Sequence, residues 1–181
     1  MRSSLVKRMG MGLLIVGVLG FLFVQLAPVF TALEWMKPST SSPSNQEAIE
    51  YEPPFTHEAT GSFTGSDGKV RGEFRVEIAQ STEEVQYGMM YRKQMAPDMA
   101  MLFLMGEEKP QSFWMHNTYI ALDIVFIDGK NTVVNVQKNC TPLTDTPRPS
   151  DGPALFVVEL QGGTADRIGI VPGDHWAYTA L

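Results

Sequence analysis

The stretch SFWMHNTYIALDIVFIDGK, residues 112–130, decides how the fold of this chain is predicted. Its aliphatic part LDIVFI, Leu122–Ile127, has the length and composition of a buried strand. The Asp128-Gly129 pair directly after it predicts a hairpin turn, and NTVVNV, residues 131–136, supplies the partner strand. The segment therefore indicates a β-sheet with an aromatic-rich turn just before one of its strands.

Two acidic residues stand out against their apolar neighbours. Asp123 shares a strand face with two aliphatic residues, and so does Glu159 in ALFVVEL, residues 154–160. A buried carboxylate is costly unless it is paired or hydrogen-bonded. In one interpretation each acid accepts backbone hydrogen bonds from a neighbouring turn; Asp123 would clamp the HNT turn, residues 116–118, and Arg92 could neutralise either acid. In the other interpretation the two acids line a site.

The flanking segments predict further short strands and two short helices. EFRVEIA, residues 73–79, alternates apolar and polar residues as a half-buried strand does, and a turn at Asp67-Gly68 predicts a hairpin with residues 61–65. Strands are also predicted at residues 100–105 and 154–160 and after the Pro-Gly turn at residues 172–173. Ser81 and Glu84 form a capping-box pattern, and Thr164 and Gly169 are the predicted start and stop of a second helix. Residues 140–153 are predicted to form a long, irregular, proline-rich loop.

The predicted fold class is therefore mainly β (α+β): a compact curled sheet or small β-barrel-like domain with two short helices. An N-terminal transmembrane or signal helix is predicted to precede it. Residues 1–8 are a basic n-region, residues 9–33 a transmembrane anchor or signal segment, residues 34–56 a linker rich in Pro, Ser and Glu, and residues 57–181 the β-rich domain.

The N-terminal segment predicts a location in the cell envelope. Met9–Phe30 is apolar except for Gln25, and at about 1.5 Å per residue it is long enough to cross a hydrocarbon core of about 30 Å. The basic residues precede this span, so the positive-inside rule places residues 34–181 outside the cytoplasm. The prediction is an inner-membrane anchor with a periplasmic domain; the alternative is a cleaved signal and secretion to the periplasm.

Charge and cysteine content exclude several classes. The chain has a net charge of −6 although its N-terminus is basic, and an acidic exported domain is a poor nucleic-acid binder. Cys140 is the only cysteine, so an internal disulfide and a CxxC zinc site are both excluded, and the thiol is predicted to be buried. We predict the membrane as one partner and a small polar ligand or an envelope protein as the other.

A polar and aromatic cluster is the candidate binding site. An aromatic face can stack on a ligand, and amide, imidazole, guanidinium and carboxylate groups orient it. The candidate ligand-binding residues are Arg92, Trp114, His116, Asn117 and Asp123. The alternative is that Trp114 packs as a cap on the sheet.

Methionines are concentrated in residues 89–115. Thioethers are soft ligands that suit Cu(I), which makes Met90, Met101, Met115 and His116 copper candidates. Methionine also fills irregular cores, and that interpretation is favoured. No metal or other cofactor is predicted.

The sequence phrases, taken in order, resemble a known family. FRVEIAQSTEEVQYGMMYR, MLF, FWMHNTYIALDIVFID and ELQGGTADRIGIVPGD are similar to those of the domain of unknown function family 192, over about residues 74–178. The resemblance implies a compact β-rich domain that often follows a signal or anchor. His116 stands where the family commonly has lysine, which removes a cation beside Trp114.

Three functions remain open at this point. The favoured one is a non-enzymatic binding module of the cell envelope for a small polar or carbohydrate-like ligand, since the chain has no GxSxG, P-loop or HExxH motif. The second is a membrane-tethered protein-interaction or structural module that docks through the loop Cys140–Pro153. The third is a hydrolase-like enzyme in which Asp123 and Glu159 divide the acid and base roles.

Overall fold

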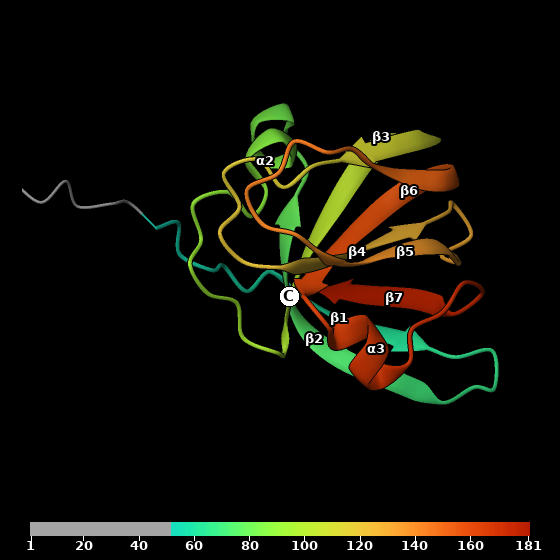
Figure 1. The fold of residues 1–181 in the computed structure, drawn as a ribbon. Coiled ribbons are helices and arrows are strands. Elements are labelled where there is room, and N and C mark those ends of the chain that lie inside the picture. The colour runs from blue at the N-terminus through green and yellow to red at the C-terminus, as the bar shows by residue number, and fades with distance from the viewer. Residues whose placement is uncertain (1–51) are drawn as a thin grey trace, which may run out of the picture. The chain divides into compact units, whose positions relative to one another are not determined.

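A computed structural model describes residues 52–181, which belong to one compact unit. Within these residues, seven strands and two short helices follow one another (Figure 1): β1 (Ala59–Thr64), β2 (Val70–Ala79), α2 (Thr82–Tyr87), β3 (Met99–Phe113), β4 (Leu122–Ile127), β5 (Val133–Cys140), β6 (Arg148–Gln161), α3 (Thr164–Ile168) and β7 (His175–Ala180). The mainly β prediction is confirmed. The segments predicted at residues 1–8 and 9–33, and most of the linker, lie outside the described residues. No helix within residues 52–181 is long and apolar enough to cross a membrane.

The strands form a single mixed sheet in the order β5-β4-β6-β3-β2-β1-β7. Every neighbouring pair is antiparallel except β2 and β3, which run parallel and are joined through α2. The two edge strands meet at one end, where Thr132 pairs with His175 and the Val133 N–H donates to the Asp174 carbonyl over 2.8 Å. The sheet is therefore curled, as predicted, and its edges are partly joined (Figure 1).

The sheet separates two hydrophobic cores. The inner core draws side chains from all seven strands and from the α3 region: Ala59, Phe63, Phe74, Val76, Ala100, Leu102, Val125, Ile127, Val133, Val158, Leu160, Ala165, Ile170 and Trp176. The outer core lies on the other face under loops: Ala79, Met89, Met95, Met101, Phe103, Met115, Leu122, Ile124, Phe126, Cys140, Ala154 and Val157. All six residues of β4 are buried because its two faces contribute to different cores.

Strand β3 folds back on itself. The rings of Phe103 and Phe113 lie 5.0 Å apart, whereas ten extended residues would separate them by about 33 Å. The register with β6 shifts between Leu104 and Lys109, and Gly106 there has φ 71°, a conformation that glycine adopts without strain. We call residues 109–113, which pair with the first part of β6, the folded arm; it returns over the outer core.

This arrangement corrects two predictions. The strand predicted at residues 100–105 continues to Phe113, and the irregular loop predicted at residues 140–153 ends where β6 begins at Arg148. Two prolines of that segment, Pro149 and Pro153, lie in β6, where Pro153 is aligned with Pro110 of the folded arm. Proline is tolerated at such register shifts because no regular ladder hydrogen bond is lost there.

The predicted caps and turns agree with the structure except at one helix start. The Ser81 hydroxyl accepts from the Glu84 N–H over 3.2 Å, and the Glu84 carboxylate accepts from the Ser81 N–H over 2.9 Å, so the capping box is confirmed. Gly169 ends α3 with φ 76° as predicted, but Gly163, not Thr164, is its N-cap. The reason is that the carboxylate of Asp123 takes the capping role that a threonine hydroxyl would have filled.

Candidate functional site

A cavity of about 150 Å³ lies between the folded arm, α2 and the outer face of the sheet. Its walls are residues 85–90 of α2 and the following turn, residues 112–114 at the end of the arm, Thr118, and Phe103, Met105 and Glu159 from the sheet. We call it the Glu159 cavity. It exists because β3 folds back, which brings its far end over its own start.

Glu159 is the one acid of the Glu159 cavity and is 4% exposed. Its Oε2 atom is buried and accepts no hydrogen bond from any of residues 52–181. Burial raises the pKa of this carboxyl to about 8, and Arg92 opposes the shift by attracting the charged form. At neutral pH the group therefore keeps its proton, and its Oε2 atom stays without a hydrogen-bond partner from the described part of the chain.

Arg92, the charged group that acts on Glu159, already forms an ion pair with Glu77. The Arg92 Nη1 and Nη2 atoms donate to the two Glu77 carboxylate oxygens over 2.7 and 2.6 Å. Both side chains are largely buried. Arg92 thus compensates Glu159 through space, as the sequence analysis allowed, whereas the Asp123 carboxylate is held by backbone N–H groups instead. Glu77 was not predicted as a partner because its strand pattern marks it only as outward-facing.

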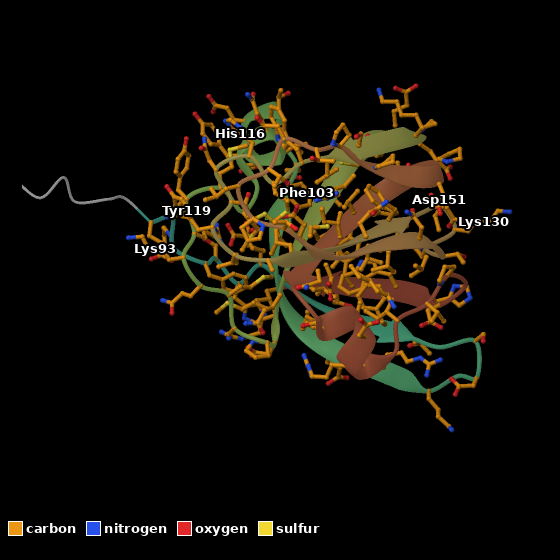
Figure 2. All side chains as sticks on the ribbon, viewed as in Figure 1. Lys93, Phe103, His116, Tyr119, Lys130 and Asp151 are labelled. Carbon is orange, nitrogen blue, oxygen red and sulfur yellow. The ribbon has the colours of Figure 1, made fainter. Side chains whose placement is uncertain are left out.

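The opening of the Glu159 cavity is aromatic. Trp114 is 49% exposed, lines the cavity and stacks on the His116 ring with centroids 5.0 Å apart. His116 itself lies outside the cavity, where its Nδ1 is 2.7 Å from Asp145 Oδ1. Figure 2 shows His116 and Tyr119 at the end of the sheet next to α2, opposite Lys130 and Asp151. Trp114 is therefore a half-exposed residue of the cavity wall, and His116 stacks on its ring.

Asn117 has a structural role next to the cavity. It has φ 51°, its Nδ2 donates to the Tyr91 hydroxyl over 2.8 Å, and its carbonyl accepts from the Tyr91 N–H over 2.9 Å. Asparagine tolerates this left-handed conformation better than most residues. These bonds join the turn after α2 to the turn after the arm and so hold two walls of the Glu159 cavity together.

Asp123 lies on the opposite face of the sheet. Its Oδ1 accepts from the N–H groups of Asn139 and Gly163 over 2.6 and 3.1 Å, and its Oδ2 accepts from the Ala165 N–H over 2.7 Å. The carboxylate caps α3, so the clamp interpretation is supported, but the clamped turn is not the HNT turn. Asp123 is aligned with Leu160 of the inner core, whereas Glu159 is aligned with Ile124 of the outer core. The two acids cannot act on one substrate.

Comparison with known proteins identifies the family. Residues 64–178 match the model of DUF192, described as "Uncharacterized ACR". The chain belongs to the DUF192 family. The earlier resemblance, seen over about residues 74–178, is confirmed and extends further toward the N-terminus.

Two solved structures are similar to this DUF192 chain. One, from Sinorhizobium meliloti, is described as a "putative transcription regulator"; it is 34% identical, has a TM-score of 0.65, and the match covers 70% of this chain and 98% of that chain. The other, from Novosphingobium aromaticivorans, is a protein of unknown function; it is 36% identical, has a TM-score of 0.64, and the match covers 71% and 94% of the two chains. Among curated proteins the comparison returned no match.

The copper candidates are dispersed in the DUF192 domain. Met115 is fully buried in the outer core, and Met101 is also part of that core. Met90 lines the Glu159 cavity, while His116 is outside it. Within residues 52–181 no three His, Cys, Asp or Glu side chains cluster as metal ligands. Met101 and Met115 therefore pack the outer core, and Met90 is not part of it.

Two larger cavities flank Arg92 in the same domain, with volumes of about 530 and 510 Å³. Residues 52–55 form part of the wall of the first, and Glu77 and Tyr91 are among the residues that line the second. Arg92 lines both cavities, and its two terminal nitrogens pair with the carboxylate of Glu77, which lines the second; its buried Nε atom has no hydrogen-bond partner among the described residues. The Glu159 cavity differs because its lining includes a carboxyl whose buried Oε2 atom has no hydrogen-bond partner among residues 52–181.

Several residues of the Glu159 cavity were missed by the sequence analysis. Phe103, Met105 and Phe113 fit an ordinary core strand, and residues 85–90 fit an ordinary helix and turn. The available signals were Glu159, an acid in an apolar strand, and Trp114 in the aromatic-rich turn. The other lining residues could not be found because the fold-back of β3 leaves no pattern beyond a glycine followed by charged residues.

Proposed function

We propose that this protein is a non-enzymatic binding module of the cell envelope that takes a small polar ligand into the Glu159 cavity. The observation that carries the proposal is the buried Oε2 atom of Glu159, which lacks a partner among the described residues and lines an open cavity. An unpaired buried polar atom costs free energy, and a ligand that hydrogen-bonds to it recovers that cost on binding. Trp114 at the rim supplies a face on which the ligand can pack.

The envelope location is the second part of this proposal. Its support is the apolar run Met9–Phe30 behind a basic start, which predicts an anchor at residues 9–33 with the domain in the periplasm. Protease treatment of spheroplasts tests it. The domain should be digested in spheroplasts and protected in intact cells; protection in both would contradict the location.

Ligand retention and selection test the binding function. The full chain, extracted from membranes, is examined by native mass spectrometry and then screened against small polar molecules by thermal shift. A true ligand should bind the wild type and Tyr119→Ala but bind Trp114→Ala at least several-fold more weakly. Tyr119 is the matched control because it is an exposed aromatic residue that does not line the cavity. A ligand that binds all three equally, or no ligand at all, would contradict the proposal.

One observation favours the interaction module as a second candidate. Leu143, in the loop between β5 and β6, is 60% exposed, and its N–H donates to the carbonyl of Thr118, which precedes exposed Tyr119 in the chain. Such apolar exposure is typical of contact surfaces. Leu143→Glu should abolish co-purification of an envelope protein with the tethered chain while leaving ligand binding unchanged.

A further inference from the structure

The chemistry of the Glu159 cavity indicates the class of its ligand. Its lining includes the rings of Tyr87, Phe103, Phe113 and Trp114 and the thioethers of Met89, Met90 and Met105. None of the described residues that line it is lysine, arginine or histidine, and Glu159 is its only acid. A cavity with electron-rich walls and one carboxyl is suited to positive charge and unsuited to anions.

The size of the Glu159 cavity limits the ligand further. A cavity of about 150 Å³ holds a molecule of about benzene's size. The apolar walls fit a compact hydrocarbon body, and the carboxyl of Glu159 offers the one strong polar contact. Gly88 forms part of the wall, and a Cβ at that position would lie 3.0 Å from the Phe103 ring and 3.9 Å from Glu159 Oε2, so the backbone itself approaches the carboxyl closely.

We propose that the Glu159 cavity binds a small organic amine in its protonated form, with the ammonium group paired to the Glu159 carboxylate and the hydrocarbon body against Trp114 and Phe113. This inference rests on the proposed function, because it assigns the ligand of the same cavity. An ammonium group satisfies the partnerless Oε2 atom with a charge-assisted hydrogen bond, which a neutral group does less strongly. Aromatic faces add attraction for the same charge.

Binding of an ammonium group should release a proton. Burial holds the pKa of the free Glu159 carboxyl near 8, and the titratable groups around it are Arg92, which favours the charged form, Tyr87 at the cavity wall and the buried thiol Cys140. Below pH 8 the carboxyl must lose its proton before it pairs with the amine. The affinity should therefore rise by up to tenfold per pH unit toward pH 8. A neutral ligand held by the protonated carboxyl would show the opposite trend, with weaker binding above pH 8.

Benzylamine and benzyl alcohol form a matched pair of probes, with the same shape and a difference of one charge. Each is titrated into the full chain between pH 6 and pH 8.5, with binding followed by calorimetry in two buffers of different ionisation enthalpy. Benzylamine should bind at least tenfold more tightly than benzyl alcohol at pH 8, with proton release at pH 6.5. Glu159→Gln keeps the shape of the side chain and should remove both the preference for the amine and the proton release; Tyr119→Ala should change neither.

The outcomes separate this inference from the proposed function. If benzyl alcohol binds as tightly as the amine, or the affinity for both falls above pH 8, the ammonium assignment is overturned while the cavity remains a binding site. If Glu159→Gln keeps the amine preference, the carboxyl is not the partner and the assignment fails. If neither probe binds, the assignment also fails; the proposed function then fails only if no screened ligand shows the dependence on Trp114.

Discussion

Asp123 and Glu159 are two buried acids on the neighbouring strands β4 and β6, but they differ in the sheet face on which they lie and in the hydrogen bonds that they accept. Asp123 faces the inner core and accepts three backbone hydrogen bonds, which cap α3 and hold the end of β5. Glu159 faces the outer core, and its Oε2 atom has no partner among the described residues. The comparison shows that burial of an acid says little about its role. The number of donors that its own fold supplies separates a structural carboxylate from one that is open to a ligand.

The largest expected effect is the loss of the Asp123 clamp. Asp123→Asn replaces a charged acceptor with a neutral amide and turns an NH₂ group toward backbone donors, so it should lower the free energy of unfolding by about 3–5 kcal/mol. Urea denaturation measures this. Asp128→Asn is the control, because Asp128 Oδ1 accepts two N–H groups in a surface turn that asparagine also favours. Similar small losses in both variants would mean that Asp123 is not a clamp.

The second prediction concerns pH and Glu159. The folded chain holds the Glu159 proton up to its pKa of about 8, whereas the unfolded chain releases it near the ordinary value of 4.5. Between these values the native state binds more protons, so the free energy of unfolding should fall as pH rises, by up to about 5 kcal/mol. In Glu159→Gln this component should vanish, and above pH 8 the variant should be more stable than the wild type. Parallel curves for the two proteins would show that Glu159 is ionised in the native state throughout.

A smaller effect is expected for the ion pair beside Glu159. Arg92→Met leaves the Glu77 carboxylate without its cation, which should cost about 1–3 kcal/mol because Glu77 keeps some access to water. It should also raise the pKa of Glu159 further, since Arg92 is the group that lowers it. Thermal and urea unfolding across pH measure both effects.

The control for Arg92 is Arg75→Met. Arg75 pairs with Asp98 over 2.8 Å, but both side chains are exposed, so this loss should be below about 1 kcal/mol. Equal losses in the two variants would show that the Arg92–Glu77 pair behaves as a surface pair.

The smallest effect on stability is expected at Trp114. The side chain is half exposed, so Trp114→Ala should change the free energy of unfolding by less than about 1 kcal/mol while weakening ligand binding at the rim of the Glu159 cavity. Urea denaturation and ligand titration on the same preparation measure the two effects. A loss of several kcal/mol would mean that Trp114 packs as a structural cap, the alternative considered from the sequence.

Local features were predictable where neighbouring residues alone decide the structure. The capping box at Ser81, the turns at Gly68 and Gly173 and the stop of α3 at Gly169 all follow from single residues and their backbone preferences. The strand predicted at Leu122–Ile127 is confirmed, because its hydrophobic pattern fits only a buried strand. The start of α3 was assigned to Thr164 in error, because its cap comes from Asp123 on a distant strand.

The candidate site was predictable only in part. Trp114 and Glu159 were identified as unusual residues and do line one cavity, whereas Arg92, His116 and Asn117 surround it and Asp123 belongs to the other face. Alternation along each strand placed Asp123 and Glu159 correctly within their own strands. The sequence did not give the register between the two strands, and a shift of one residue would exchange the sheet faces on which the two acids lie.

The sequence by itself therefore determined the family, the mainly β class, most turns and caps, and which residues are out of place in their strands. Each of these depends on contacts within a few residues along the chain. Only the tertiary structure decided that β3 folds back at Gly106, that the two acids lie on opposite faces, and that one of them lacks a partner in the described part of the chain. The physical reason is that these properties depend on which atoms from distant segments reach a buried group, and that is fixed by packing across the whole sheet.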